Sequence, residues 1–566
     1  MTYYPPEVPR QIEIPDYPLQ HLLESAACQH PDAVATTFFG ATMTYSRLEQ
    51  EANRFAHGLI DMGVAPGDRV AIHLPNSPQF LICLFGTLKA GAVATLASPL
   101  HEVRELAYQL NDSGARVLVT LSRRDILKRA RAAREDSSVE RLIVTSIKDC
   151  FSPSMRLLFT LFKEKKEGHR AELDAARGEV WFESVLERKP DETPGVRIDA
   201  GSAALLQYTG GTTGLPKAAE LTHRNLVANA LQSRAWLHNM VDARERVLVV
   251  LPLFHVYALT SCMLAISRAA SLILLPRFDL AEVLKTIDRE RPTLFPGIPA
   301  MYAAINHSLE RDRADGRKKI DLSSIHTCVS GADKLPREIQ QEFEELSGGR
   351  VVEGYGLTEA SPVTHVNPIA GMRKTGSIGL PLPNTEVRIV DIETGEDLPT
   401  GEIGEMLVRG PQVMRGYWGQ AALSEDAFAD GDWLRTGDMA SVDEDGFYFI
   451  ADRRKDLIIT GGLNVYPREI EEVLGQFHKI SEVAVKGVPH KLKGEIVKAY
   501  IVLKDNEKAT ASEIRNFAQE KLAGYKVPNR IEFRSELPRN ILRKVLKREL
   551  GNDGDDAEDE TPRSSP

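Results

Sequence analysis

The stretch Gln207-Tyr-Thr-Gly-Gly-Thr-Thr-Gly-Leu-Pro-Lys-Ala-Ala-Glu-Leu-Thr-His223 indicates an anion-binding loop. It follows the apolar run 203–206, which has the composition of a short buried strand. Glycines let backbone N–H groups approach an anion, while threonine hydroxyls and a lysine ammonium group donate hydrogen bonds to it. We therefore predict a loop that holds the phosphates of a nucleoside triphosphate, built from Thr209, Gly210, Gly211, Thr212, Thr213, Gly214 and Lys217.

Other kinds of glycine-rich loop fit this stretch less well. A plain turn does not need six consecutive glycine and threonine residues followed by a lysine. The kinase and GTPase pattern G-x-x-x-x-G-K-[ST] is not met, because Lys217 follows Pro216 and precedes Ala218. The dinucleotide pattern G-x-G-x-x-G is also missing, and Leu215-Pro216 is a poor start for a helix that meets a pyrophosphate.

Composition narrows the class of protein. The chain has 566 residues, of which 42% are apolar, so we expect two or more hydrophobic cores. Its net charge of −10 argues against nucleic acid as a partner. The longest uncharged run, 247–267, contains Pro252 and His255, and we expect it to lie in the core and not in a membrane.

The cysteines and the N-terminus indicate a cytoplasmic protein. Residues 1–7 contain neither a basic nor an apolar region, so we expect no signal peptide. The cysteines are odd in number and lack C-x-x-C spacing. We expect reduced residues, mostly in apolar stretches of the core, at Cys28, Cys83, Cys150, Cys262 and Cys328.

Strand and helix patterns alternate along the N-terminal part, which predicts an α/β fold with a parallel sheet. The expected strands are 34–39, 41–44, 69–73, 92–97 and 116–120. Helical patterns lie near 21–23, from 45 onward, at 78–90 and at 102–113. Past Thr385, short β-rich runs at 387–390, 405–409 and 447–450 predict a small, mostly β subdomain.

Tyr208–Lys217, followed by Leu221-Thr-His-Arg-Asn-Leu226, resembles the signature of the adenylate-forming superfamily. That superfamily includes acyl-CoA synthetases, luciferases and the adenylation domains of peptide synthetases. The resemblance runs from about His21 to Leu550 and is greatest to the acyl-CoA synthetase branch, of the long-chain fatty acid–CoA ligase type. It departs at Ala218, where the family usually has glycine.

The resemblance implies further nucleotide contacts in two turns that follow strands. Ligands of open α/β sheets bind beyond the carboxyl ends of strands, so these turns should face the same crevice as the phosphate loop. Thr358 resembles the donor to the α-phosphate, and Glu359 resembles the Mg²⁺ ligand. The adenine wall is implied at Gly331, Ala332, Glu353, Gly354 and Tyr355, and Gly356 is implied as a further ATP-binding residue.

The resemblance also implies a division of the chain into domains. The N-terminal domain, 1–452, would bind ATP and the acyl group, and a small mobile α/β domain, 453–550, would follow. The hinge is implied at Lys455, with Arg453 near the nucleotide and Asp438 on the ribose. Gly461 and Gly462 would contact CoA. The tail 551–566 is acidic and rich in serine and proline, so we expect it to be disordered.

The catalytic lysine of the family is implied at Lys544, because the registers on both sides of it agree with the family's closing motif. The preceding residue is Arg543, where the family usually has glycine. The alternative is that Lys544, Lys547 and Arg548 form a solvated basic face. Lys217, Thr358 and His255 are the other residues for which the resemblance implies a part in catalysis.

Two features concern the acid substrate. Amino-acid-activating relatives carry Phe-Asp where this chain has Phe254-His255, so an ammonium group would stay unpaired in the pocket. We therefore expect an acid without an α-amino group. The segment 149–174 has an apolar run and a basic end, and long-chain members carry a similar insertion. It either covers a substrate entrance or packs on the core, or it lies on a membrane surface.

Together these features predict a ligase of fatty acid metabolism. ATP and CoA would be co-substrates with Mg²⁺ as cofactor, and AMP and pyrophosphate would be released through an acyl-adenylate. The alternatives are an adenylating enzyme that passes the acyl group to a carrier protein or oxidises it, and a non-catalytic ATP-binding relative. A cytoplasmic location is expected, and peripheral association with the inner face of the membrane and a homodimer are left open.

Overall fold

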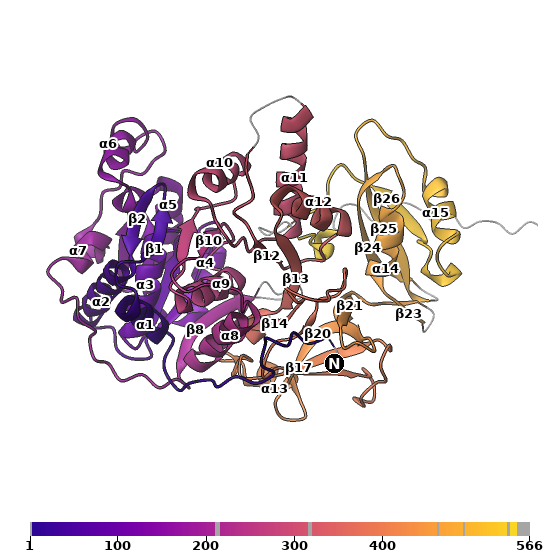
Figure 1. Ribbon diagram of the computed structural model, residues 1–566, viewed down its shortest axis with the longest axis horizontal. Coiled ribbons are helices and arrows are strands. Elements are labelled where there is room, and N and C mark those ends of the chain that lie inside the picture. The colour runs from indigo at the N-terminus through magenta and orange to yellow at the C-terminus, as the bar shows by residue number, and fades with distance from the viewer. Residues whose placement is uncertain are drawn as a thin grey trace, which may run out of the picture. The chain divides into compact units, whose positions relative to one another are not determined.

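The structure is a computed structural model that describes residues 3–209, 216–314, 320–460, 463–490, 493–539 and 544–551 (Figure 1). It divides into two compact units, which are described separately. The first consists of Met1–Arg388, Leu407–Arg435 and Glu444–Tyr448, and the second of Ile389–Met406, Thr436–Asp443 and Phe449–Pro566. The domain boundary between 452 and 453 stays a prediction, and the tail from 552 onward lies outside the described residues.

An eight-stranded sheet forms the centre of the first unit, in the order β18-β9-β8-β4-β3-β5-β6-β7. Strands β8, β4, β3, β5, β6 and β7 pair in parallel, while β9 and β18 are antiparallel to their neighbours. The predicted α/β fold is therefore confirmed. The bounds are β3 (Arg69–His73), β4 (Val93–Leu96), β5 (Ala115–Leu121), β6 (Arg141–Thr145), β7 (Glu179–Trp181), β8 (Ala203–Thr209), β9 (Lys217–Thr222) and β18 (Gly416–Tyr417).

Helices cover both faces of this sheet, as right-handed crossovers require. The chain moves from β3 to β4 in one direction and from β4 to β5 in the other, so α3 and α4 lie on opposite faces. Accordingly α3 packs on α2, which also contacts α7, and α4 packs on α5. Every residue of α3 is buried. The bounds are α1 (His21–Gln29), α2 (Tyr45–Asp61), α3 (Pro78–Lys89), α4 (Val103–Ser113), α5 (Arg124–Glu135) and α7 (Phe182–Leu186).

A second group of strands in the first unit forms the sheets β10-β11-β1-β2 and β12-β13-β14-β15. Parallel bridges from Leu294 to Val247 and to Thr327 connect β10 to β12. The strands are β1 (Val34–Phe38), β2 (Ala41–Thr44), β10 (Arg246–Val249), β11 (Ser271–Leu274), β12 (Thr327–Ser330), β13 (Arg350–Gly356), β14 (Val363–Val366) and β15 (Leu380–Pro381). The helices among them are α8 (His223–Trp236), α9 (Val256–Ser267), α10 (Leu280–Glu290), α11 (Pro299–Ala314) and α12 (Arg337–Ser347).

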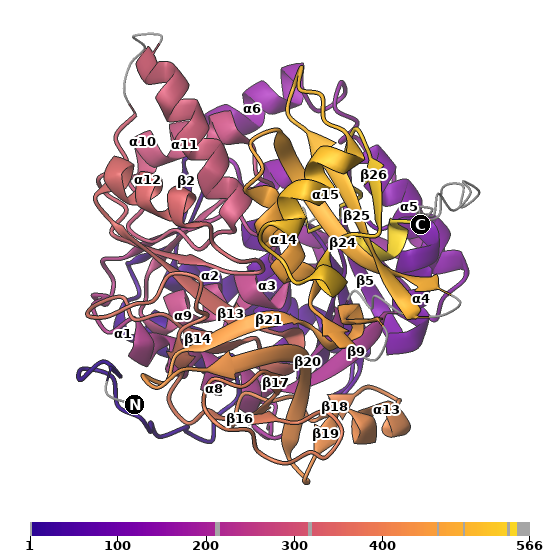
Figure 2. The same cartoon turned by 90° about the vertical axis from the view of Figure 1, so that its right-hand side faces the viewer.

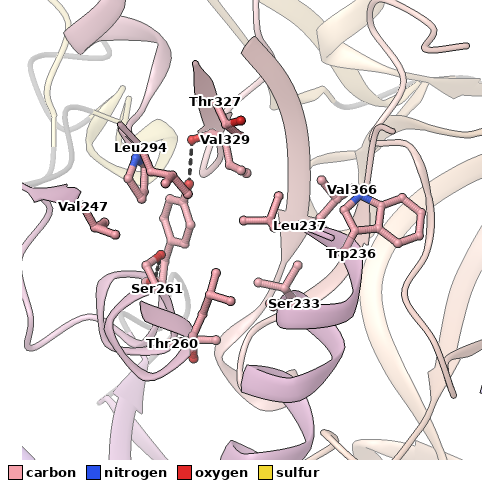
Figure 3. A pocket seen from close by; sticks show the side chains of 14 residues that line it. Ser233, Trp236, Leu237, Val247, Thr260, Ser261, Leu294, Thr327, Val329 and Val366 are labelled. Atoms are coloured by element: carbon pink, nitrogen blue, oxygen red, sulfur yellow. Dashed lines mark hydrogen bonds between the residues drawn. The ribbon is translucent and has the colours of Figure 1, made fainter. Parts of the chain in front are cut away.

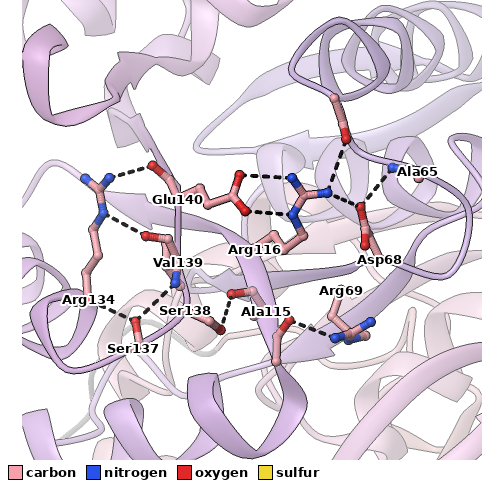
Figure 4. A network of polar contacts seen from close by, with 12 residues as sticks. Ala65, Asp68, Arg69, Ala115, Arg116, Arg134, Ser137, Ser138, Val139 and Glu140 are labelled. Carbon is pink, nitrogen blue, oxygen red and sulfur yellow. Dashed lines mark hydrogen bonds and ion pairs between the residues drawn. The ribbon is translucent and has the colours of Figure 1, made fainter.

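A polar network fixes the amino ends of the central strands (Figure 4). The Arg116 guanidinium donates to Asp68 at 2.6 Å and to both carboxylate oxygens of Glu140 at 2.9 and 3.0 Å. Arg69 donates to the carbonyl of Ser113 at 2.7 Å. These bonds tie the starts of β3, β5 and β6 together, away from the carboxyl ends where ligands of such sheets bind.

The second unit contains a small α/β domain. Its sheet has the order β23-β22-β25-β24, with β26 beside β25, and α14 lies on β24 (Figure 2). Its core includes Ile458, Val485, Val497 and Ile514. The bounds are β22 (Ile458–Thr460), β23 (Leu463–Val465), α14 (Pro467–Gly475), β24 (Ile480–His490), β25 (Gly494–Leu503), α15 (Ala511–Gln519), β26 (Arg530–Phe533) and η6 (Lys547–Glu549).

The predicted β-rich region past Thr385 is also confirmed. Its strands follow the order β16-β17-β20-β19, with β21 beside β20. The bounds are β16 (Glu386–Val390), β17 (Gly404–Arg409), α13 (Ala421–Asp426), β19 (Phe428–Ala429), β20 (Trp433–Val442), β21 (Tyr448–Arg453) and η4 (Arg454–Asp456).

The structure tests the expected burial of the cysteines and of the uncharged run 247–267. Cys83, Cys262 and Cys328 are buried as expected, but Cys28 is exposed, because it occupies the solvent side of α1. The uncharged run 247–267 forms β10 and the largely buried helix α9, as predicted. Among the residues that the structure describes, none of the helices has the length and apolar character needed to cross a membrane.

Candidate active site

The predicted phosphate loop joins two antiparallel strands. β8 ends at Thr209 and β9 begins at Lys217, and these two residues are cross-strand partners. The Thr209 hydroxyl donates to the Lys217 carbonyl at 3.4 Å. Gly210, Gly211, Thr212, Thr213 and Gly214 lie outside the described residues. Because β8 pairs in parallel with β4, its end at Thr209 lies on the sheet edge where ligands bind.

The side chain of Tyr417 contacts both Lys217 and Glu359. The Lys217 Nζ atom lies 5.1 Å from the centre of the Tyr417 ring. The Tyr417 hydroxyl donates to Glu359 Oε1 at 2.8 Å. Burial and the neighbouring Glu359 carboxylate raise the pKa of Tyr417 well above its ordinary value, so the phenol stays protonated and remains a donor. The structure thus joins the phosphate loop to the proposed metal ligand.

No motif in the sequence predicts that Tyr417 lies beside Lys217 and Glu359. It reaches Lys217 because β18 pairs with β9, with Tyr417 opposite Ala219. A backbone bond from Met414 N to the Glu359 carbonyl, 2.8 Å long, holds the same segment against the turn that carries Glu359. Pairing between segments so far apart in the sequence leaves no local pattern.

The turn that carries Thr358 and Glu359 is a short 3-10 helix, η3 (Thr358–Ala360), directly after β13. Both side chains are partly buried. A Cβ atom at Gly356 would lie 2.2 Å from the Pro362 carbonyl oxygen, so only glycine fits at that position. Thr260 of α9 donates to the Ser361 carbonyl at 2.6 Å and fixes the far side of the turn.

The residues proposed for the adenine wall lie at the ends of two paired strands. Gly331 and Ala332 follow β12, which pairs in parallel with β13, the strand that contains Glu353, Gly354 and Tyr355. Ala332 adopts a left-handed conformation with φ 69°. Glu353 is buried, and its carboxylate accepts from the Leu335 backbone at 3.2 Å. The two predicted turns therefore lie side by side, as expected.

His255 is the residue that precedes α9, at the N-cap position, and it is partly buried. Burial, with a smaller contribution from nearby His101, lowers the pKa of His255 to about 4, so the imidazole is neutral at pH 7. Gln207 of β8 donates to the Phe254 carbonyl at 2.9 Å, which places this turn next to the start of the phosphate loop.

Several predicted residues belong to the second unit. Arg453 Nε lies 3.4 Å from Asp438 Oδ1, so the structure brings these two residues together. Burial, followed by the charge of Arg453, lowers the pKa of Lys455 in η4. Lys544 is exposed. Lys547 pairs with Glu471 at 2.8 Å. Gly461 and Gly462 lie outside the described residues.

Comparison with known proteins identifies the family. Residues 23–418 match the model of the AMP-binding enzyme family, and residues 469–544 match that of the AMP-binding enzyme C-terminal domain. The chain belongs to the AMP-binding enzyme family. The predicted membership of the adenylate-forming superfamily is therefore confirmed.

Individual relatives of this AMP-binding enzyme span nearly its whole length. A long-chain-fatty-acid–CoA ligase of Bacillus subtilis (strain 168) is 43% identical over 554 residues, 97% of each chain. A feruloyl-CoA synthase of Amycolatopsis sp. is 36% identical over 523 residues, 92% of this chain and 96% of the relative. A solved anthranilate CoA ligase in complex with anthranoyl-AMP has a TM-score of 0.81 and 28% identity, and the match covers 95% of this chain and 97% of that one. These relatives confirm the predicted class of enzyme, an acyl-CoA ligase.

The AMP-binding enzyme offers a fitting environment for Mg²⁺. This ion is usually held by one or two carboxylates together with substrate phosphates and water. One oxygen of Glu359 accepts from Tyr417. Within the described ranges no group of three or more His, Cys, Asp or Glu side chains could form an all-protein cage. A single carboxylate, that of Glu359, beside the predicted phosphate loop would fit the way Mg²⁺ binds with a nucleotide.

Proposed function

We propose that this enzyme activates a long-chain fatty acid with ATP and then forms the CoA thioester. A carboxylate oxygen attacks the α-phosphorus of ATP, the bond to pyrophosphate breaks, and an acyl-adenylate forms. The CoA sulfur then attacks the acyl carbon, the bond to the AMP oxygen breaks, and the thiol proton passes to solvent. The name of the Bacillus subtilis relative supports this substrate class.

An apolar cavity beside the proposed nucleotide site is the observation that carries the proposal (Figure 3). It has a volume of about 50 Å³ and lies between α8, α9, β12 and β14. The Tyr257 ring lines it and also faces Gly331, where a Cβ atom would lie 3.2 Å from that ring. Its other walls include Trp236, Leu237, Val247, Leu264, Val329 and Val366.

The lining of this cavity selects for an apolar group. Apolar area removed from water contributes roughly 25 cal/mol per Å², so each methylene that enters adds to binding. A cavity that admits benzene has a volume of about 150 Å³, so side chains must move before a long chain can enter this one. Ser233 and Ser261 are small residues of the lining. A larger side chain at either position would fill the cavity and keep an acyl chain from entering it.

His255 supports the expected lack of an α-amino group. A neutral imidazole cannot neutralise a substrate ammonium group, whereas the carboxylate of amino-acid-activating relatives can. An amino acid would therefore bring an unpaired charge into a poorly hydrated site.

The charged and hydroxyl groups of the chain support the proposed adenylation step. Attack of a carboxylate on a polyanion is repulsive until positive charge offsets it. Lys217 and the Thr358 hydroxyl would supply donors to the phosphates, and Lys544 would bridge the acid and the α-phosphate, as the resemblance implies. When bound to Glu359, Mg²⁺ would neutralise phosphate charge.

A panel of acids, assayed for AMP release with and without CoA, tests this function. The panel contains fatty acids of six, ten and sixteen carbons, an aromatic acid and a 2-amino fatty acid. We expect the highest kcat/KM for the sixteen-carbon acid, AMP release that depends on CoA, and no turnover of the amino analogue. A preference for the aromatic acid, or CoA-independent turnover, would contradict the proposal.

A variant of α9 tests whether the cavity holds the acyl chain. Ser261→Phe adds a ring to the lining and should lower kcat/KM for the sixteen-carbon acid by about tenfold or more, with little effect on the six-carbon acid. Ser261→Ala removes the hydroxyl, which donates to the Tyr257 carbonyl at 2.9 Å, without adding volume. It should keep the preference of the parent enzyme. Equal losses for short and long acids in Ser261→Phe would place the chain elsewhere.

A further inference from the structure

Two side chains of α4, Tyr108 and Asp112, contact the strand ends on either side of residues 210–215. The Tyr108 hydroxyl donates to the carbonyl of Pro216, the residue before β9, at 3.0 Å. The Tyr208 hydroxyl, one residue before the end of β8, donates to the Asp112 carboxylate at 2.7 Å. Side chains four residues apart lie on the same face of a helix, so one face of α4 contacts both strand ends.

Other contacts fix α4 in the first unit. Leu106 and Leu110 are fully buried in a core cluster. A capping box of Glu102 and Glu105 satisfies backbone groups at the amino end of the helix. Gly114, in a left-handed conformation, ends it. The helix therefore does not need its two bonds to the strand ends, and it can act as a fixed support for them.

The bond to Pro216 constrains the backbone that leads into Lys217. The proline ring fixes φ at about −65°, so ψ is the soft torsion that remains before Lys217. The carbonyl that Tyr108 binds belongs to the planar peptide unit that includes the Lys217 nitrogen, and holding its oxygen restricts this torsion. From there the Lys217 side chain extends to Tyr417, and its ammonium group lies 5.1 Å from the ring centre.

The bond between Tyr208 and Asp112 constrains the other strand end. Burial, followed by the hydrogen bond to Asp112, raises the pKa of Tyr208 well above its ordinary value, so the phenol remains a donor. Hydrogen bonds to a carboxylate are shorter and stronger than bonds between neutral groups. The next residue, Thr209, is the cross-strand partner of Lys217. The two contacts of α4 therefore act on one pair of residues, Thr209 and Lys217.

We propose that Tyr108 and Asp112 are positioning residues for ATP, which hold Thr209 and Lys217 in the arrangement that receives the phosphates before the nucleotide binds. Groups that are already ordered lose less freedom on binding, so the affinity for ATP rises. Neither side chain of α4 belongs to the glycine- and threonine-rich stretch that predicts the phosphate loop. This role rests on the proposed binding of ATP at that loop and is independent of which acid is activated.

Calorimetric titration of the full-length protein with ATP and Mg²⁺, in the absence of an acid, tests the proposal. Tyr108→Phe removes the hydroxyl and keeps the ring, so it should raise the Kd for ATP about fivefold. Asp112→Ala should raise it by a similar factor. Asp112→Asn should restore most of the affinity, because its amide oxygen can still accept from Tyr208. An unchanged Kd in Tyr108→Phe and Asp112→Ala would overturn the proposal.

Steady-state kinetics separate positioning from catalysis. In Tyr108→Phe the KM for ATP should rise about fivefold, while kcat and the KM values for acid and CoA stay within about twofold of the parent, because the loss falls on binding of ATP. A fall in kcat with an unchanged KM for ATP would overturn the proposal, since it would place the role of Tyr108 in the chemical step.

A matched control separates positioning from a general loss of stability. Tyr45→Phe also removes a tyrosine bond to a backbone carbonyl, that of Ala270 at 2.6 Å. It should lower the unfolding midpoint and leave the Kd for ATP unchanged. Tyr108→Phe should show the opposite pattern, because α4 keeps its core contacts. If both variants raised the Kd in step with a lower unfolding midpoint, the effect would be loss of structure and the proposal would be wrong.

Lys217→Ala distinguishes failure of this proposal from failure of the proposed ATP site. It removes a charged donor of the predicted loop and should raise the Kd for ATP about tenfold or more. If Lys217→Ala weakens binding and Tyr108→Phe does not, only the positioning role is overturned. If Lys217→Ala binds ATP as the parent does, the proposed role of the loop fails and the positioning role fails with it.

Discussion

Tyr417 shows how one residue can organise a site. Its hydroxyl holds Glu359 at 2.8 Å, and its ring lies 5.1 Å from the Lys217 ammonium group. A cation over an aromatic face and a carboxylate on the phenol place opposite charges at fixed positions with one rigid side chain. Both charged groups are thereby set before a nucleotide binds, which lowers the cost of ordering them in the reaction.

The proposed metal role of Glu359 leads to the first prediction. Glu359→Gln removes the charge but keeps the shape, so pyrophosphate release should fall by about two orders of magnitude or more, and the Mg²⁺ concentration for half-maximal rate should rise. The measurement is initial-rate pyrophosphate release against Mg²⁺ concentration.

Tyr417→Phe is the matched control for this variant. It removes the hydrogen bond to Glu359 and leaves the carboxylate in place. We expect a smaller loss of rate, about tenfold, with the Mg²⁺ dependence largely kept. If Glu359→Gln showed the parent's Mg²⁺ dependence, Glu359 would not be the metal ligand.

At the residue scale, sequence reasoning found the positions that follow strands. Gly331 and Thr358 stand directly beyond strand ends, where local pattern and the resemblance agree, and the structure places their turns side by side. Tyr417 was missed because its place depends on pairing between β18 and β9. A local sequence pattern cannot predict a contact between residues 200 positions apart, such as Lys217 and Tyr417.

At the element scale, the βαβ units could be predicted almost to the residue. The strand expected at 69–73 is β3, and the helix expected at 78–90 is α3. Apolar runs with the right period and short loops suffice for such local units. The pairing of β1 with β11, and the link from β10 through Leu294 to β12, could not be predicted, because they join distant segments.

The second prediction concerns β3 and its buried histidine. His73 is fully buried, and burial lowers its pKa to about 3, with His101 and Arg129 adding to the effect. Below pH 6.5, His73 therefore binds a proton in the unfolded chain but not in the folded chain. This histidine lowers the free energy of unfolding as pH falls from 6.5 toward 3, by up to about 1.4 kcal/mol per pH unit.

Urea unfolding at pH 7 and pH 4.5 measures this effect. Between these two pH values, the free energy of unfolding of His73→Asn should fall by about 2 to 3 kcal/mol less than that of the parent. The substitution also removes the hydrogen bond between His73 Nδ1 and the Thr120 hydroxyl. The control is His307→Asn, at an exposed position of α11, which should follow the parent. A parallel pH dependence of His73→Asn and parent would show that His73 titrates normally in the fold.

At the scale of the whole molecule, the proposed chemistry draws on residues of both units. Lys217, Thr358 and Glu359 belong to the first, while Asp438, Arg453, Lys455 and Lys544 belong to the second. The resemblance implies that the second part of the chain rotates about Lys455 between adenylation and thioester formation. Lys544 would then act only in the first half-reaction, which makes the two halves separable by mutation.

The last prediction separates the half-reactions. Lys544→Ala should lower acyl-adenylate formation by roughly two to three orders of magnitude, the loss seen when one preorganised transition-state donor is removed. Supplied with synthetic acyl-adenylate and CoA, the same variant should still make thioester. Lys455→Pro, which stiffens the proposed hinge, should show the reverse pattern.

Lys547→Ala is the matched control, because it removes a neighbouring lysine of the same segment, one whose ammonium group pairs with Glu471 at 2.8 Å. It should lower stability slightly and leave both half-reactions near the parent's rates. Each half-reaction is followed on its own, by pyrophosphate release and by thioester formation from the adenylate. If Lys544→Ala slowed both halves equally, the rotation would be wrong for this chain. If it slowed neither, while Lys547→Ala slowed adenylation, the catalytic lysine would be Lys547, and the ion pair with Glu471 would have to open during the reaction.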